Sequence, residues 1–266
     1  MNKGEKFKMN KTMKKYTVIT GASSGIGYET AKAFADQGKN LIVIARRQNN
    51  LEELKQEILE KSPNLDIVIK ATDLSVMKKV YQLYDDLKNY NIETWINNAG
   101  FGNHDSVANQ DLKKTESMLH LNVEALTILS SLYVNEYKDI EGTQLINVSS
   151  AAGYTIVPNA VTYSAAKFYI SAFTEGLAWE LKESNSKMQA KVLAPAATQT
   201  EFANIANNVS EYDYDKNFAT YHTSQQMAMF LLELYNSDKT VGSVDLKSFS
   251  FELTEPILPY IKNLIV

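Results

Sequence analysis

Apolar residues along the chain form two kinds of pattern, which alternate from the first strand onward. Short continuous apolar runs predict buried strands at 16–20, 41–45, 66–71, 94–97, 144–148 and 190–194. Apolar residues at helical spacing predict helices over 27–38, 49–62, 76–90, 112–138 and 161–184. Strands with continuous rather than alternating apolar residues are typical of a parallel sheet covered on both faces. The pattern therefore predicts a doubly wound α/β fold.

The domain organisation follows from what interrupts this alternation. No Pro- or Gly-rich linker divides the 266 residues, so residues 15–266 are predicted to form one domain with ligands at the carboxyl ends of its strands. The lysine-rich residues 1–14 lack the apolar core of a signal peptide and are predicted to be a disordered tail. The chain has no run of about 18 apolar residues, so no membrane span is expected.

Charge and composition exclude several classes of function. The net charge of −4 provides no broad basic field, so no nucleic-acid partner is expected. The absence of cysteine excludes disulfides and thiolate chemistry, and it fits a cytoplasmic location. The three histidines have no close spacing, which argues against a metal site built on them.

A glycine-containing turn joins the first predicted strand to the first predicted helix. In VITGASSGIG (18–27), Gly21 permits a tight turn, Gly25 lets backbone approach a ligand, and Gly27 lets the helix pack against the sheet. The N-terminus of that helix offers N–H groups and partial positive charge to a pyrophosphate. The spacing differs from the common G-x-G-x-x-G fingerprint, so a purely structural turn is the alternative interpretation.

The end of the second predicted strand bears on which dinucleotide would bind. An acidic residue there would contact the ribose of NAD, whereas an arginine accommodates the 2′-phosphate of NADP. The chain reads Ala45, Arg46 and Arg47, with no acid. These arginines predict a preference for NADP(H) over NAD(H), and a pair of solvated surface arginines is the alternative.

Tyr163 and Lys167 lie four residues apart in a predicted helix and therefore share one face. An unperturbed tyrosine has a pKa of about 10, too high for proton exchange near neutrality. A nearby ammonium favours the phenolate, so Lys167 is expected to lower the pKa of Tyr163. Taken alone, the pair has a structural alternative, in which Tyr163 packs in the core and Lys167 extends to solvent.

Five separated motifs now occur in a characteristic order. They are TGASSGIG (20–27), NNAG (97–100), LNVEA (121–125), NVSSAAG (147–153) and YSAAK (163–167). Together they resemble the classical short-chain dehydrogenases/reductases over about residues 15–200. The resemblance implies a single Rossmann-type doubly wound parallel sheet flanked by helices on both faces, NAD(P)(H) as cofactor, and a homodimer or homotetramer.

The resemblance assigns catalytic roles to Asn122, Ser150, Tyr163 and Lys167. Ser150 is preferred to Ser149 because 13 positions separate it from Tyr163, as the family pattern requires. Tyr163 would exchange a proton with the substrate, and Ser150 would hold the reacting oxygen. Lys167 would also bind the nicotinamide ribose, and Asn122 would kink its helix and hold a water in a proton relay. The expected cofactor contacts are Gly21, Ser23, Ser24, Gly25, Ile26, Gly27, Arg46, Arg47, Asp73, Leu74, Asn98, Ala99, Gly100, Tyr163, Lys167, Pro195 and Thr198.

These assignments predict an NADP(H)-dependent oxidoreductase that interconverts a carbonyl and an alcohol on a small-molecule substrate. One alternative is a non-catalytic NADP-binding sensor or scaffold, which would have no need of the proton-transfer residues. Another is a nucleotide-sugar epimerase or dehydratase, whose glycine turn more often reads G-x-x-G-x-x-G.

The segments outside the motifs allow fewer conclusions. Residues 199–222 match the family's mobile substrate lid, in which four aromatic residues would either contact substrate or pack a helical flap: Tyr212, Tyr214, Phe218 and Tyr221. His104 follows NNAGFGN, and a solvated loop position is favoured there over substrate contact. Pro195-Ala196 replaces the family's common Pro-Gly, and the C-terminal sequence leaves the last strand and the subunit contacts open.

Overall fold

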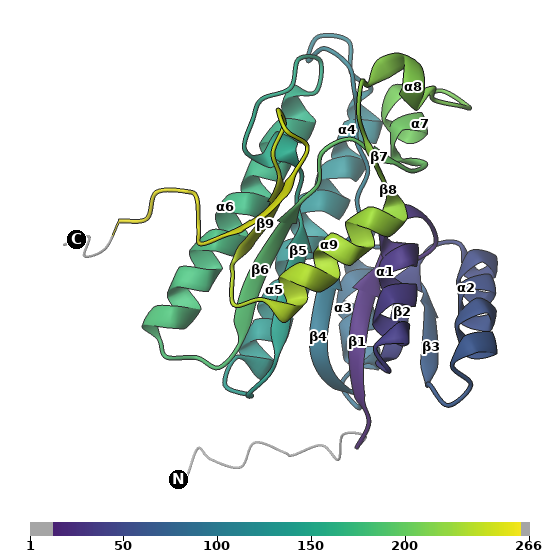
Figure 1. The fold of residues 1–266 in the computed structure, drawn as a ribbon, viewed down its shortest axis with the longest axis vertical. Coiled ribbons are helices and arrows are strands. Elements are labelled where there is room, and N and C mark those ends of the chain that lie inside the picture. The colour runs from purple at the N-terminus through teal and green to yellow at the C-terminus, as the bar shows by residue number, and fades with distance from the viewer. Residues whose placement is uncertain (1–12, 262–266) are drawn as a thin grey trace.

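The computed structural model describes residues 13–261 and is built on one large sheet (Figure 1). Its strand order is β10-β9-β6-β5-β4-β1-β2-β3, and every neighbouring pair is parallel except β9 and β10. The strands are β1 (Lys15–Thr20), β2 (Asn40–Ala45), β3 (Ile67–Ala71), β4 (Asn91–Asn97), β5 (Gln144–Val148), β6 (Gln189–Ala194), β9 (Val241–Val244) and β10 (Phe251–Thr254). The predicted doubly wound parallel sheet is confirmed. Residues 1–12 of the predicted tail lie outside the described residues.

Helices cover both faces of this sheet. The bounds of the longer helices are α1 (Gly25–Asp36), α2 (Gln48–Lys61), α3 (Met77–Asp86), α4 (Leu112–Leu119), α5 (Leu126–Tyr137), α6 (Val161–Glu183) and α9 (Ser224–Asn236). Phe34 of α1, Leu51 of α2 and Leu231 of α9 are fully buried in one core layer. The second layer holds Trp95 of β4 with side chains of α3, α5 and α6.

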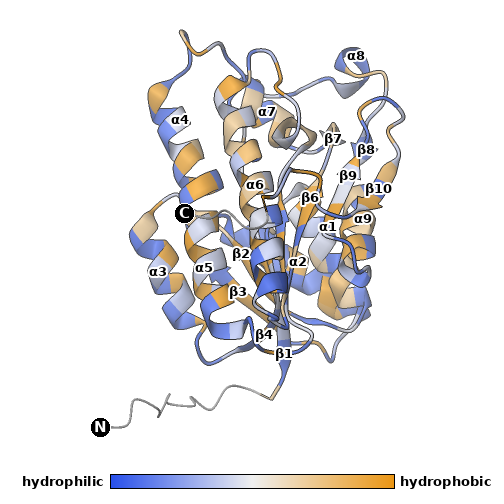
Figure 2. Cartoon of the chain, turned by 90° about the vertical axis from the view of Figure 1, so that its left-hand side faces the viewer, coloured by the Kyte–Doolittle hydropathy of each residue, from blue (hydrophilic) through white to orange (hydrophobic). Residues whose placement is uncertain are grey.

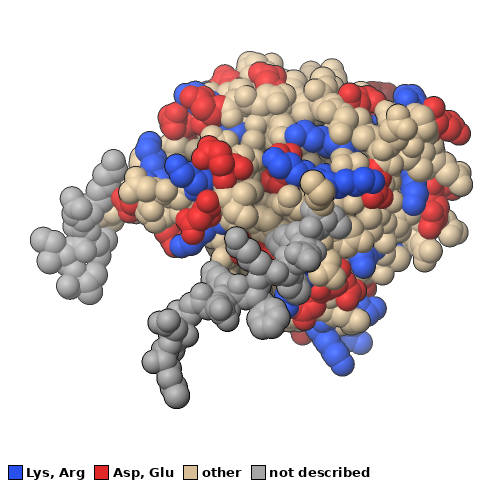
Figure 3. Space-filling view, turned by 90° about the horizontal axis from the view of Figure 1, so that it is seen from below, with Lys and Arg blue, Asp and Glu red and all other residues tan. Residues whose placement is uncertain are grey.

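The helices carry both polar and apolar positions. Figure 2 shows hydrophilic and hydrophobic positions along α3, as expected for a helix that buries Val80, Leu83 and Tyr84 on one side. The underside of the molecule, where the strands begin, carries charges of both signs side by side (Figure 3). Within residues 13–261, no helix has the length and apolar character needed to cross a bilayer.

Two features differ from the sequence prediction. The predicted helix over 112–138 is two helices joined by a π-helical segment, His120–Ala125, which contains Asn122. The helix α9 and the strands β9 and β10 that follow it were not predicted; β10 is short and pairs within the sheet only with β9. The predicted strands and the other predicted helices are all present, with boundaries shifted by a few residues.

The lid is a small substructure above the carboxyl ends of the strands (Figure 1). It contains α7 (Phe202–Asn207) and α8 (Tyr214–Asn217), and it is framed by a two-stranded sheet of β7 (Thr198–Gln199) and β8 (His222–Thr223). The strand order reverses at β1, which lies between β4 and β2. In such sheets, ligands bind at the carboxyl ends of the strands next to the reversal.

Candidate active site

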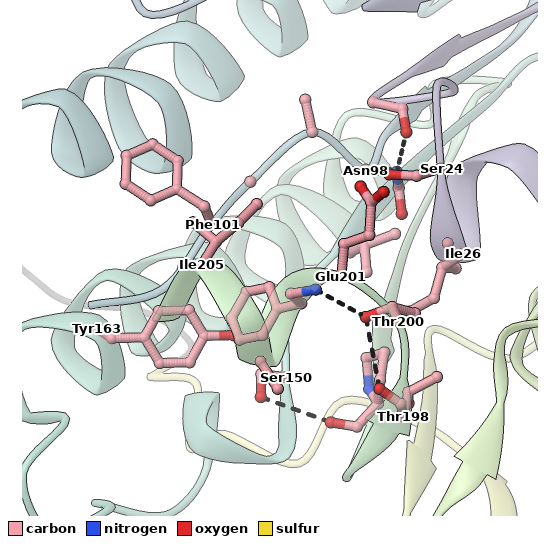
Figure 4. A pocket seen from close by; sticks show the side chains of 18 of the residues that line it. Ser24, Ile26, Asn98, Phe101, Ser150, Tyr163, Thr198, Thr200, Glu201 and Ile205 are labelled. Atoms are coloured by element: carbon pink, nitrogen blue, oxygen red, sulfur yellow. Dashed lines mark hydrogen bonds between the residues drawn. The ribbon is translucent and has the colours of Figure 1, made fainter. Parts of the chain in front are cut away.

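A cavity of about 510 Å³ opens at that point, between the glycine turn and the lid. Figure 4 shows Ser24 and Ile26 toward one end and Tyr163, Ser150 and Phe101 toward the other. We call the first the turn end, lined by Gly21 and residues 23–26 with Arg46, Arg47 and Asp73. The second is the lid end, lined by Phe101, His104, Ser150, Tyr163, Phe202, Ile205 and Asn207.

The glycine turn has the backbone geometry that its sequence predicts. Gly21 and Gly25 have φ angles of +70° and +57°, which side chains other than glycine rarely adopt. A Cβ at Gly27 would collide with Gly21 O and Asn98 Nδ2, so the start of α1 packs directly beneath the turn. No side chain of the described residues caps the first turn of α1, so its N–H groups are available to an anion at the turn end.

The loop after β4 holds the turn from the other side. The Asn98 side-chain amide donates to Thr20 O at 3.0 Å and to Gly21 O at 3.4 Å. Thr20 Oγ1 accepts from the backbone N–H groups of Asn98 and Ala99. Asn98 therefore shapes the cavity through the backbone that it fixes.

The two arginines after β2 differ in their contacts. Arg47 donates to Ser24 Oγ at 2.7 Å, to Ser23 Oγ at 3.3 Å and to the Glu201 carboxylate at 2.8 Å. Arg46 lies near Asp73. Burial raises the pKa of Asp73, but hydrogen bonds from Ser75 and the charge of Arg46 outweigh this effect, so the pKa of Asp73 is lower than usual. Arg47 therefore links the glycine turn to the lid, whereas Arg46 lies on the Asp73 side.

Ser150 and Tyr163 meet at the lid end. Ser150 follows β5, its Oγ accepts from Ala152 N at 3.1 Å and donates to Pro195 O at 3.5 Å, and it lines the cavity beside Tyr163. The Ser149 hydroxyl is instead bonded to α6, to Lys167 O at 2.9 Å and Ser171 Oγ at 2.8 Å. Of the two serines, Ser150 is the one that faces Tyr163.

Lys167 is buried one helical turn below Tyr163. Its Nζ donates to Val148 O at 2.9 Å and lies 5.8 Å from the centre of the Tyr163 ring. Burial lowers the pKa of Lys167 to about 7. Burial also raises the pKa of Tyr163 well above its ordinary value, and the nearby Ser150 hydroxyl lowers it only in part. The prediction of a lowered Tyr163 pKa is therefore wrong for this structure, because burial dominates and the ammonium points at a carbonyl.

Asn122 lies behind this group, in the π-helical segment. Its amide donates to Phe101 O at 2.9 Å and accepts from Phe101 N at 3.2 Å. A Cβ at Gly100 would lie 3.0 Å from Asn122 Oδ1 and 3.8 Å from Lys167 Nζ. Where the sequence predicted that Asn122 kinks its helix, the structure has the π-helical segment. Such π turns inside helices often occur at functional sites.

The comparisons with known proteins agree with this geometry. A family model described as short chain dehydrogenase matches residues 15–210. The chain belongs to the short-chain dehydrogenase/reductase family. It is 29% identical over 219 residues to human dehydrogenase/reductase SDR family member 11, covering 80% of this chain and 83% of that protein. An uncharacterized oxidoreductase of Staphylococcus saprophyticus is 30% identical over 207 residues, covering 77% and 81%. Both relatives support a general oxidoreductase role.

Among solved structures, a short-chain dehydrogenase from Sphingobium yanoikuyae in complex with NADPH superimposes with a TM-score of 0.80 at 25% identity. The match covers 87% of this chain and 88% of that one. The bulky-bulky ketone specific alcohol dehydrogenase of Comamonas testosteroni gives a TM-score of 0.76 at 24% identity, covering 87% and 86%, which shows a shared fold.

For this short-chain dehydrogenase/reductase, all but two of the site residues expected from sequence line the one cavity. The exceptions are Gly27, which lies beneath the turn, and Asn122, which lies behind Gly100. Thr198 lines the cavity with its hydroxyl bonded to Ala196 O at 2.9 Å. Pro195 O accepts from Ala151 N at 2.8 Å, which ties the loop after β6 to the loop after β5.

Several lining residues were not identified from the sequence. His104 is half-buried, and its ring lies edge-on to Tyr163 with ring centres 6.0 Å apart, so the favoured interpretation as a solvated loop residue is wrong. Phe202 of α7 lies 5.5 Å from Tyr163 by ring centres, and Glu201 pairs with Arg47. The only sequence signal for Glu201 and Phe202 was their place within the lid, and for His104 it was its place directly after NNAGFGN.

The four aromatic residues named in the lid from the sequence pack on one another, and three of them also line the cavity. The lid residues Tyr212, Tyr214 and Phe218 line the cavity. They also pack on one another, with the Tyr214 ring centre 5.3 Å from those of Tyr212 and Tyr221. Tyr221 packs in this cluster and is not among the lining residues.

Proposed function

We propose that the protein is an NADP(H)-dependent oxidoreductase that interconverts a carbonyl and an alcohol by hydride transfer, with Tyr163 as general acid and base. The observation that carries this proposal is the pair Ser150 and Tyr163 at one end of a cavity whose other end presents a helix N-terminus and Arg46. The NADPH complex of the related structure supports the choice of cofactor.

The cavity fits such a cofactor. The first turn of α1 would hold the pyrophosphate, Arg46 with Arg47 would hold the 2′-phosphate, and Asp73 with Leu74 would lie beside the adenine. Residues 98–100, Pro195, Thr198 and Lys167 would surround the nicotinamide and its ribose. When bound, the cofactor supplies or accepts the hydride.

The residues of the chain would manage the proton. Tyr163 gives a proton to the carbonyl oxygen in reduction and takes one from the alcohol in oxidation. Ser150, within hydrogen-bond reach of Tyr163, holds the reacting oxygen. Lys167, whose pKa of about 7 allows proton exchange near neutrality, would pass protons toward Tyr163. Asn122 fixes the backbone at Phe101, next to the site.

We also propose one catalytic domain over residues 15–266, with the lid at 199–222, in a cytoplasmic homodimer or homotetramer. Residues on α4, α5 and α6 support the subunit contact. The apolar side chains of Leu112, Leu119 and Tyr169 are exposed, and the Tyr169 hydroxyl bonds to Thr127 Oγ1 at 2.9 Å, linking α6 to α5. Light scattering at micromolar concentration tests this proposal, and a strictly monomeric mass would contradict it.

The test of the activity is a panel of aldehydes, ketones and alcohols followed at the nicotinamide absorbance with each cofactor. We expect steady NADPH oxidation with at least one carbonyl compound. Tight NADPH binding without turnover on any member of a broad panel would contradict the enzyme proposal and favour a binding module.

A further inference from the structure

The charged residues that line the cavity are unevenly distributed. Asp73, Arg46, Arg47 and Glu201 lie around the turn end, and Glu201 is paired with Arg47 at 2.8 Å. The Lys167 ammonium is buried and donates to Val148 O at 2.9 Å. Lys114 lies behind the lid end, where its ammonium donates to Ile205 O at 2.6 Å and Asn208 Oδ1 at 2.7 Å. Among the described residues that line the lid end, none is therefore a cation that could pair with an anionic substrate.

The walls around Tyr163 are apolar. Tyr163 packs in a cluster with Met118, Ala152 and Ala160, and Phe101 and Phe202 cover this cluster. Figure 4 shows Phe101 and Ile205 on the same side of the cavity as Tyr163. A carboxylate, phosphate or sulfonate placed here would lose its hydration without gaining an ion pair, which is strongly unfavourable.

His104 and Asn207 are the polar exception at the lid end. The backbone N–H of His104 donates to Ala206 O at 2.9 Å, which places its ring against α7. The ring lies 6.0 Å from Tyr163 and 6.4 Å from Phe202 by centres. His104 and Asn207 both line the cavity here, and the Asn207 amide donates to Ala203 O at 2.8 Å.

The imidazole of His104 is uncharged near neutrality. Burial lowers its pKa below the usual value, the nearby Asn207 amide offsets this only in part, and the charge of Lys114 lowers it further. A neutral imidazole has one N–H donor and one acceptor nitrogen, so on the cavity wall it suits a neutral polar group of a ligand.

We propose that the substrate is an uncharged carbonyl compound with an aromatic or bulky aliphatic body, and that His104 with Asn207 determines this specificity from the lid end. This inference rests on the proposed oxidoreductase function. It goes further by naming the substrate class and a specificity-determining pair. A cation at position 104 should therefore admit an anionic substrate that the native side chain rejects.

The experiment compares two aldehydes with the same skeleton, methyl 4-formylbenzoate and 4-formylbenzoate, with NADPH as cofactor. We expect the native enzyme to prefer the ester over the carboxylate by at least about 10-fold in kcat/KM. In His104→Arg this ratio should move toward the carboxylate by about 10-fold or more, the scale of a charge-assisted hydrogen bond. Comparing ratios between variants cancels the different intrinsic reactivities of the two aldehydes.

Two controls separate local from general effects of charge. His104→Gln keeps a neutral polar side chain, and its ratio should stay within about 3-fold of the native ratio. Asn109→Arg adds the same charge at an exposed position of the neighbouring loop and should leave the ratio unchanged. If His104→Arg does not fold, Asn207→Lys places a cation at the partner position, with the same expected shift.

The outcomes distinguish this inference from the proposed function. Turnover with the carboxylate preferred by the native enzyme would overturn the inference and leave the oxidoreductase function standing. A folded, active His104→Arg with an unchanged ratio, or an equal shift in Asn109→Arg, would overturn the role of His104. No turnover of any carbonyl compound would overturn the function, and the inference with it.

Discussion

The turn end of the cavity is shaped mainly by backbone, whereas the lid end is shaped by side chains from separate segments. At the turn end, Gly21 and Gly25 adopt positive φ and the start of α1 presents N–H groups. At the lid end, His104, Tyr163 and Phe202 come from three different segments and pack ring against ring. A backbone site suits a ligand that the whole family shares, and a side-chain site can change its specificity without disturbing the fold.

The largest expected effect separates chemistry from cofactor binding. Tyr163→Phe removes the proton donor at the lid end and leaves the turn end intact. Turnover should fall by about 10² or more, the scale of general acid–base catalysis. NADPH affinity, measured by fluorescence titration, should stay within about 3-fold of the native value. Near-native turnover in the pure variant would show that another group transfers the proton.

The second prediction concerns cofactor choice at the turn end. Arg46→Ala should weaken NADPH binding by about 10- to 150-fold, because a charge-assisted hydrogen bond to phosphate contributes about 1.5–3 kcal/mol. NADH affinity should change little, since NADH has no 2′-phosphate. Arg47→Ala is the comparison variant, and its loss should be smaller because Arg47 is already engaged by Ser24 and Glu201. Equal native affinities for NADPH and NADH would refute the predicted cofactor preference.

The third prediction uses Lys167, which lies between the two ends. Its pKa is about 7 in the folded protein and about 10.4 in an unfolded chain, so between these values the unfolded chain binds more protons. The free energy of unfolding should therefore rise with pH, by up to about 1.4 kcal/mol per pH unit from this group. Urea unfolding of the native protein and of Lys167→Met at pH 7, 7.5 and 8 measures this slope.

Lys191 is the internal comparison for that measurement. Burial lowers its pKa to about 8, and its ammonium donates to Leu234 O at 3.0 Å and to Ser237 O at 2.6 Å at the end of α9. Its contribution has the same sign and begins at higher pH, so the slope below pH 8 reports mainly on Lys167. An equal slope in Lys167→Met would place the titrating group elsewhere.

The two ends also differ in how far the sequence predicts them. The glycine turn is set by residues adjacent in the chain: Gly21 forms the predicted tight turn at positive φ, and Gly27 packs beneath it as predicted. The contacts of His104 and Glu201 depend on how α7 lies over the cavity, which no local pattern encodes. The direction of the Tyr163 pKa shift was wrong for a related reason: helical spacing gives the distance to Lys167, and burial depends on the whole fold.

The smallest expected effect tests the contact that joins the two ends. Glu201 immediately precedes α7 and pairs with Arg47 at 2.8 Å, with both side chains about half exposed at 50% and 45%. An exposed ion pair contributes about 0–1 kcal/mol, so Glu201→Gln should change affinities by only a few-fold. It frees Arg47 and removes a negative charge near the expected 2′-phosphate, so NADPH should bind about 2- to 5-fold tighter while NADH is unaffected. Glu211→Gln, an exposed position of the same lid, makes the same charge change as a matched control and should alter neither affinity. Weaker NADPH binding in Glu201→Gln would mean that the lid contact supports the cofactor rather than competing with it for Arg47.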